Sequence, residues 1–351
     1  MSSAKMVKDP IVTEKSERGE KFIQWVLNNA ILLVLAALFI VIVVIDPTFL
    51  NLRNFKNILK MASTRTIMAL GVGGIIVTKG TDLSLGRQVG LAAIVCASLL
   101  QAETYATRMY PDLPVLPVIV PIIVVICLTA FISFINGFVV SKLHVDPFIA
   151  TLGMMVIIFG VNCLYVDRPP FGAQPIGSLD DRYKSLAQGS LKIGGVEIPH
   201  LILIAIAACI IAWILWNKTK FGKNMFAIGG NREAALVSGV PVVRYLLLTY
   251  TFAGALYGLG GALEAGRIGS ATNNTGNMYE LDAISACIVG GLSFDGGIGS
   301  VGGVIIGVLI FQVIAYGLTY IGVSSYLQYI IKGLIIISAV AIDTIKNSKK
   351  K

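Results

Sequence analysis

Long apolar blocks, separated by short polar stretches, dominate this chain. Every residue from Ala30 to Ile45 is apolar, and blocks of similar length recur as far as the last ten residues. Because a helix needs about 20 mostly apolar residues to cross a bilayer core, the pattern predicts an all-α polytopic membrane protein of about ten transmembrane helices. The expected segments are 24–45, 59–78, 85–102, 115–140, 147–165, 199–216, 242–263, 282–294, 301–320 and 325–343.

The composition agrees with this pattern and excludes a soluble protein. The chain is 56% hydrophobic and 13% charged, and its mean hydropathy is +0.81, whereas soluble domains are about 25% charged. A cleaved signal peptide does not explain the first block, because about two dozen mostly polar residues precede it and no small-residue cleavage site follows.

The net charge of +9 gathers in three basic clusters, Lys5 to Lys21, Lys218 to Arg232 and Lys346 to Lys351. Basic loops stay in the cytoplasm and attract anionic lipid, so both termini are expected inside, which an even number of spans permits. The clusters hold too few aromatic residues for nucleic-acid binding. Three further basic residues do not fit this topology, because they lie in or near the first outer loop: Arg53, Lys56 and Lys60. We expect Lys60 and Arg65 to snorkel to the interface.

The same argument divides the chain into parts. We expect a cytoplasmic tail over 1–23, a membrane domain over 24–343 and a second cytoplasmic tail over 344–351. Residues 217–241 form the basic cytoplasmic loop. The outer loop 167–198 is long for a connector, and both a surface for an external partner and a plain solvated loop remain open.

The chain carries little that predicts chemistry. Its five cysteines lie in apolar stretches without a CxxC pair, so neither a disulfide framework nor a metal site is expected. Lys223 follows Gly222 but is itself followed by Asn224, and the upstream glycine of a phosphate-binding loop is missing. We therefore expect no ATP hydrolysis by this chain alone, no catalytic residues and no bound cofactor.

Polar residues at membrane depth are expensive and need a reason. Asp82 or Ser84 can cap the helix that follows or line a conduction path, and Glu280 and Asp282 suit either a helix dipole or an outer mouth. Asp295 is expected in a turn, and Lys332 needs a partner that the sequence does not identify. The candidates for a translocation path or gate are Asp82, Ser84, Gln88, Asn136, Asn162, Glu280, Asp282 and Asp295.

The basic loop contains a predicted short amphipathic helix. Asn231 suits its N-cap, Glu233 lies in its first turn, Gly239 can end it in a left-handed conformation and Pro241 blocks continuation. The alternatives are a helix that docks on a soluble partner and an ordinary interfacial helix. The residues assigned to the segment are Gly222, Lys223, Gly229, Gly230, Asn231, Arg232, Glu233, Ala234, Ala235 and Gly239.

With these motifs the chain resembles the ribose/branched-chain class of ABC importer permeases over nearly its full length. The matching pieces are Gly80–Gly86, Phe221–Gly239, Tyr279–Ile284 and the glycine-rich stretch to Gly303. Pieces similar to the galactose/methyl-galactoside type are Gly86–Ala93, Glu264–Asn274 and Tyr316–Gly322.

The resemblance implies an ABC permease fold in a bacterial inner membrane and a homodimer of permease copies. It also implies a separate ATPase subunit that binds ATP and Mg²⁺ and docks on the segment 217–241, and a periplasmic sugar-binding protein. A ribose- or xylose-type permease is the near alternative. An ion-coupled secondary transporter, with Asp82 and Asp295 as its buried acids, is the alternative from another class.

Overall fold

The computed structural model describes residues 33–168, 172–194 and 196–348. The expected tail 1–23, the start of the first segment and residues 349–351 lie outside this part. The helices are Leu33–Ile45, the short 3₁₀ helix η1 (Pro47–Phe49), α2 (Leu52–Val77), α3 (Leu85–Leu99), α4 (Ile119–Lys142), α5 (Pro147–Val166), α6 (Asp181–Gln188), α7 (His200–Lys218), α8 (Lys220–Gly230), α9 (Arg232–Val237), α10 (Val242–Ile268), α11 (Tyr279–Val289), α12 (Val301–Tyr320) and α13 (Ser325–Ser348).

The all-α membrane fold is confirmed, and each expected segment coincides with a helix. Within the described residues, five helices are long and apolar enough to cross a membrane on their own, namely α4, α5, α7, α10 and α12. Helices α3 and α11 have only 15 and 11 residues. At about 1.5 Å per residue they fall short of a bilayer core of about 30 Å, so both start or end inside the membrane domain.

Several helix boundaries differ from the expectation. Helix α2 begins at Leu52 rather than near 59, because Asn51 caps it by accepting a 2.8 Å hydrogen bond from the Asn54 amide. Helix α13 continues to Ser348, so most of the expected C-terminal tail 344–351 is helical. These ends are polar, and a hydropathy pattern does not register polar helix turns.

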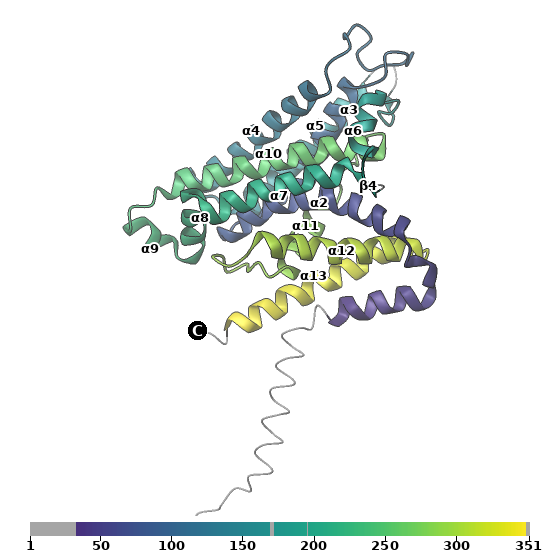
Figure 1. Ribbon diagram of the computed structural model, residues 1–351. Coiled ribbons are helices and arrows are strands. Elements are labelled where there is room, and N and C mark those ends of the chain that lie inside the picture. The colour runs from purple at the N-terminus through teal and green to yellow at the C-terminus, as the bar shows by residue number, and fades with distance from the viewer. Residues whose placement is uncertain (1–32, 169–171, 195, 349–351) are drawn as a thin grey trace, which may run out of the picture.

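Helix α10 is the central element, in contact with α2, α3 and α4 (Figure 1). Small residues permit this packing: a Cβ on Gly258 would lie 2.7 Å from the Val125 carbonyl oxygen, and one on Gly254 would lie 2.6 Å from Ser133. Their spacing of four residues keeps both on one face of α10. The two glycines therefore serve helix packing within the chain.

The two ends of the helix bundle differ. Helices α8 and α9 lie at one end, together with the end of α13, while α6 and strand β4 lie at the other (Figure 1). The segment 167–198, with Pro199 after it, forms two antiparallel hairpins, β1 (Asp167–Arg168) with β2 (Gly172–Ala173), and β3 (Ser190–Ile193) with β4 (Val196–Pro199).

This segment is a folded cap on the end of α10. The buried Tyr183 of α6 donates its hydroxyl hydrogen to the Ala262 carbonyl oxygen, and Gln188 Nε2 donates to the Gly266 carbonyl at 3.0 Å. On the exposed side of the cap, a 2.7 Å hydrogen bond from Arg182 lowers the pKa of Asp180. The cap is therefore anchored by the buried Tyr183 and by Gln188, and it presents charged side chains outward.

Candidate functional site

The short helix in the basic loop is present with the predicted ends. Asn231 Oδ1 accepts the Ala234 amide at 2.9 Å and caps α9. Gly239 has a φ of 81°, the left-handed conformation that a glycine adopts without strain. Pro241 then precedes α10. Local capping chemistry therefore sets both ends of α9.

The side chains that α9 offers to a partner differ from the expectation. Ala235 is only 5% exposed, buried against Ile228 of α8 and Val242 and Leu246 of α10, so a docking role for Ala235 itself is wrong. Leu236 and Val237 are 57% and 84% exposed. The exposed residues among those assigned to the segment are Lys223, Gly230, Asn231, Arg232, Glu233, Ala234 and Gly239.

Two of the assigned glycines face inward. A Cβ on Gly222 would overlap the Trp216 carbonyl oxygen at the end of α7, and one on Gly229 would overlap the Val77 carbonyl oxygen at the end of α2. Both residues are buried. They join the basic loop to the membrane helices and do not reach an external partner.

Four of the candidate path residues meet in one buried network. Asp82 Oδ1 accepts hydrogen bonds from the Ser84 amide at 2.9 Å and from the Ser84 hydroxyl at 2.6 Å. Gln88 and Asn136 donate to Ser84 Oγ at 2.9 and 3.0 Å. The hydroxyl of Ser133, which the sequence analysis did not select, donates to Gln88 Oε1 at 3.0 Å.

This network lies where the chain leaves α2 and enters α3. Ser84 is the N-cap position of α3, but its side chain makes no capping hydrogen bond. The Ser84 hydroxyl instead donates a hydrogen bond to Asp82 and accepts hydrogen bonds from the side-chain amides of Gln88 in α3 and Asn136 in α4. Of the two caps that the sequence offered for α3, Asp82 accepts a backbone amide at the start of the helix, whereas Ser84 does not cap and instead joins a fixed polar network between these helices.

A second polar group surrounds the start of α11. Glu280 is 8% exposed, and a Cβ on Gly86 would overlap one of its carboxylate oxygens. Asn162 of α5 donates to the Arg87 carbonyl at 3.1 Å. Arg87 itself donates to Asn277 Oδ1 at 2.7 Å. Glu280 and Asn162 thus meet at the N-terminal part of α3, beside the Asp82 network.

The partner of Lys332 is Asp282. Lys332 Nζ lies 2.8 Å from Asp282 Oδ1, and the two side chains are 22% and 12% exposed. The pair joins α13 to α11, two residues beyond Glu280. Asp282 is therefore neutralised within the chain, which explains how both charges are tolerated at membrane depth.

Asp295 does not join the other candidates. It is exposed in the glycine-rich turn between α11 and α12, where its amide donates to Ser293 Oγ at 3.2 Å. A Cβ on the neighbouring Gly296 would lie 2.7 Å from the Gly229 carbonyl oxygen, which places this turn beside α8. The turn expected from the sequence is present, and Asp295 lies at the α8 end, away from a buried path.

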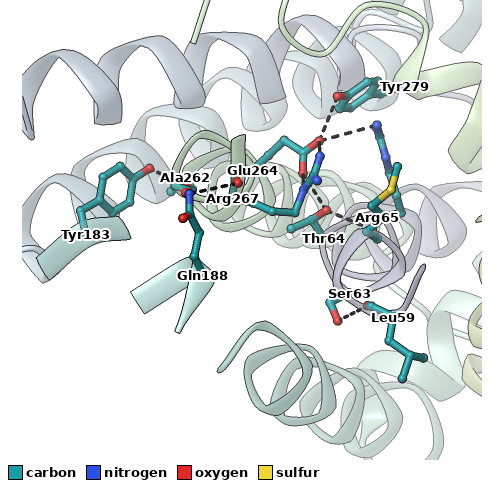
Figure 2. A network of polar contacts seen from close by, with 12 residues as sticks. Leu59, Ser63, Thr64, Arg65, Tyr183, Gln188, Ala262, Glu264, Arg267 and Tyr279 are labelled. Carbon is teal, nitrogen blue, oxygen red and sulfur yellow. Dashed lines mark hydrogen bonds and ion pairs between the residues drawn. The ribbon is translucent and has the colours of Figure 1, made fainter. Parts of the chain in front are cut away.

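A buried charge cluster was missed in the sequence. Glu264 of α10 is fully buried, and its carboxylate accepts hydrogen bonds from Thr64 at 2.8 Å, Arg267 at 2.9 and 3.0 Å, and Tyr279 at 2.9 Å (Figure 2). Arg65 lies 3.7 Å from the same carboxylate and stacks on the Tyr279 ring.

The position of Arg65 corrects the expectation that it snorkels to the interface. Its side chain is only 13% exposed and points into the cluster (Figure 2). Glu264 and Arg267 are three residues apart in a mostly apolar block, and this spacing was the available signal. The sequence did not show that Arg65, 199 positions earlier, packs beside Glu264.

Comparison with known proteins places these features in a family. A family model described as the permease component of a branched-chain amino acid transport system matches residues 54–340. The galactose/methyl galactoside import permease protein of Haemophilus influenzae is 55% identical over 92% of this chain and 96% of its own length. That of Escherichia coli is 53% identical over 95% of this chain and 98% of its own length.

A ribose import permease protein is more distant. That of Bacillus subtilis is 37% identical over 89% of this chain and 91% of its own length. No solved structure matches the chain. Since the family model covers most of the sequence and these relatives match nearly all of it, the chain belongs to the permease components of the branched-chain amino acid transport system family.

Proposed function

We propose that this chain is the membrane-spanning permease subunit of an ATP-driven importer that moves galactose or methyl galactoside into the cytoplasm. The observation that carries the proposal is the difference in identity between two groups of relatives. Three galactose/methyl galactoside import permeases are 53 to 55% identical to this chain, a fourth, from Treponema pallidum, is 38% identical, and ribose import permeases are 32 to 37% identical. Each of these comparisons covers at least 89% of this chain.

Energy comes from a separate ATP-binding subunit that holds ATP and Mg²⁺. The sequence has no phosphate-binding loop, so this chain acts as a transport subunit without an ATPase site. The exposed Leu236 and Val237 of α9, with the basic Lys223 and Arg232 beside them, offer this partner an apolar anchor within a charged rim.

The Asp82 network supplies the polar lining of the sugar path. Hydroxyl, amide and carboxylate groups suit the hydroxyl groups of a monosaccharide. In this network they are already hydrogen-bonded to one another, so a passing sugar competes with existing contacts. Such a site binds its solute weakly, which suits a path more than a storage site.

A second copy of the chain completes the path. Arg87, Asn277, Asp282 and Lys332 are only half-buried, although they come from the membrane domain. Arg87 binds Asn277 and Lys332 pairs with Asp282 within the chain, but the parts of these polar groups that stay exposed are still costly against lipid. Packing this polar face against the same face of another copy gives a homodimer with a polar seam at its centre.

The subunit lies in the bacterial inner membrane with many spans and both termini in the cytoplasm. The end of the molecule that carries α8 and α9 then faces the ATP-binding subunit. The folded cap with α6 faces the periplasm and offers exposed charged residues, such as Arg182 and Lys184, to a sugar-binding protein.

Uptake by intact cells tests the substrate. Deleting the gene for this chain is expected to abolish high-affinity uptake of radiolabelled galactose and methyl galactoside, and a plasmid copy is expected to restore it. Ribose uptake by the same cells is the control and should persist. Loss of ribose or xylose uptake with intact galactose uptake would assign the chain to another branch of the family.

Reconstituted vesicles test the energy source. Galactose uptake should require the ATP-binding subunit, ATP and the binding protein, and an ionophore should leave it unchanged. Uptake driven by an ion gradient in vesicles that hold this chain alone would identify a secondary transporter instead.

A further inference from the structure

Gly229, next to last in α8, lies where three distant segments meet. Its backbone touches the end of α2 and the glycine-rich turn between α11 and α12. A Cβ at this position would overlap the Val77 carbonyl oxygen and lie 2.6 Å from the Gly297 amide nitrogen. Any side chain larger than hydrogen would therefore push α8 away from both segments.

The glycine-rich turn between α11 and α12 contacts both α8 and the end of α2. The Gly297 amide donates to the Val77 carbonyl at 2.8 Å. A Cβ on Gly296 would lie 2.7 Å from the Gly229 carbonyl oxygen and 3.1 Å from that of Val77. Three backbone segments are thus in direct contact, with the Lys79 side chain packed against Gly296, and such an arrangement has little room to absorb a displacement.

On one side of this contact lies α9. Ala235 of α9 packs against Ile228, the residue before Gly229, in a small apolar cluster with Val242 and Leu246. A movement of α9 therefore reaches Gly229 through a single packed side chain.

On the other side lies the Asp82 network. Val77 is the last residue of α2, and the chain reaches Thr81 and Asp82 within the next few residues. Tyr250 of α10 donates its hydroxyl hydrogen to the Thr81 carbonyl at 3.4 Å and lies beside Gly80. The loop that carries Asp82 is thus short and held at both ends, and it follows the end of α2.

We propose that the contact of Gly229 with Val77 and Gly297 transmits the displacement of α9 to the Asp82 network, which makes Gly229 a positioning residue for transport. The inference rests on the proposed function, because it needs a partner that moves α9. The inference gives Gly229 a different role from that of the exposed residues in the loop 217–241. The exposed residues bind the partner, and Gly229 transmits the movement to the end of α2 and the glycine-rich turn.

The test compares two glycine-to-alanine variants in the reconstituted complex of permease, ATP-binding subunit and binding protein. Gly229→Ala introduces the overlap. Gly302→Ala is the matched control, because Gly302 is also helical, lies near the same turn, and a Cβ there meets no atom within 4 Å. Sugar uptake and ATP hydrolysis are both measured per assembled complex, so that losses of folded protein cancel.

Gly229→Ala is expected to assemble with the ATP-binding subunit and to hydrolyse ATP, while the sugar moved per ATP falls about tenfold or more, within the usual range of coupling energies. Gly302→Ala should keep the wild-type ratio. An unchanged ratio for Gly229→Ala would overturn the inference. Failure of the wild-type chain to bind any ATP-binding subunit would instead overturn the proposed function.

A measurement on the wild-type complex covers the case in which Gly229→Ala does not fold. Hydrogen exchange, followed by mass spectrometry, is compared with and without ATP. Exchange is expected to change together in peptides covering 228–238, 293–299 and 78–84. A response confined to 228–238 would show that the movement of α9 stops at α8, and the inference would be wrong.

Discussion

Glu264 shows at the scale of single residues how a charge is tolerated inside this membrane domain. Its carboxylate is hydrogen-bonded by Thr64, Arg267 and Tyr279, and Arg65 lies close to it. Removing one partner from a buried ion pair is costly, because the other charge stays buried without compensation. The cluster joins α2, α10 and the start of α11, so its loss should loosen all three.

Glu264→Gln is expected to lower the free energy of unfolding by about 3 kcal/mol or more. The neutral amide would leave Arg65 and Arg267 near each other without a counterion. Thermal unfolding of the purified protein in detergent measures the effect.

Glu197→Gln provides the matched control. Glu197 pairs with Lys192 at 3.2 Å across the β3–β4 hairpin, where the two side chains are 48% and 77% exposed. Exposed pairs contribute about 0 to 1 kcal/mol, so this variant should unfold almost as the wild type does. Equal effects of the two substitutions would contradict the assigned role of the Glu264 cluster.

At the scale of elements, α9 is the clearest candidate for recognition of the ATP-binding subunit. The residues that cap α9 were predictable, because an N-cap side chain and a left-handed glycine interact with backbone groups only a few positions away in the chain. Which face of α9 turns outward was not predictable. That face depends on how α8 and α10 enclose Ala235, and it leaves Leu236 and Val237 exposed.

Leu236→Ser should weaken binding of the ATP-binding subunit by on the order of 2 kcal/mol, as expected for an apolar anchor at the centre of an interface. Sugar uptake should fall with it, while the thermal stability of the permease stays near wild type. Co-purification from detergent extracts, followed by quantitative immunoblotting, measures the change.

Leu191→Ser is the corresponding control. Leu191 is 46% exposed on β3, at the opposite end of the molecule, so this variant should co-purify normally. Normal assembly and uptake of Leu236→Ser would show that α9 is not in the interface, and would favour a transporter that needs no ATP-binding subunit.

For the whole molecule, the distribution of basic residues predicts the orientation in the membrane. In a variant without the five native cysteines, a cysteine at position 3 or 349 is expected to resist a membrane-impermeant maleimide in intact cells. A cysteine in place of Asp181, which is 95% exposed on the cap, should react. Ready labelling at position 3 or 349 would show that the predicted orientation is wrong.

The sequence by itself determined the features that depend on local composition. Apolar blocks near bilayer length predicted the all-α membrane fold, and motifs over most of the chain indicated the family. Asn231 and Gly239 set the ends of α9, because capping involves only neighbouring backbone groups. The turn around Asp295 was equally local.

Only the tertiary structure decided which distant residues meet. Lys332 finds Asp282 fifty positions earlier, Ser84 binds Asn136 instead of capping its own helix, and Gly229 touches Val77 and Gly297. Sequence periodicity indicates that a residue is buried, but the same apolar block can pack against many others. Close glycine contacts and buried charge pairs require specific helix positions, which arise only when all the helices pack together.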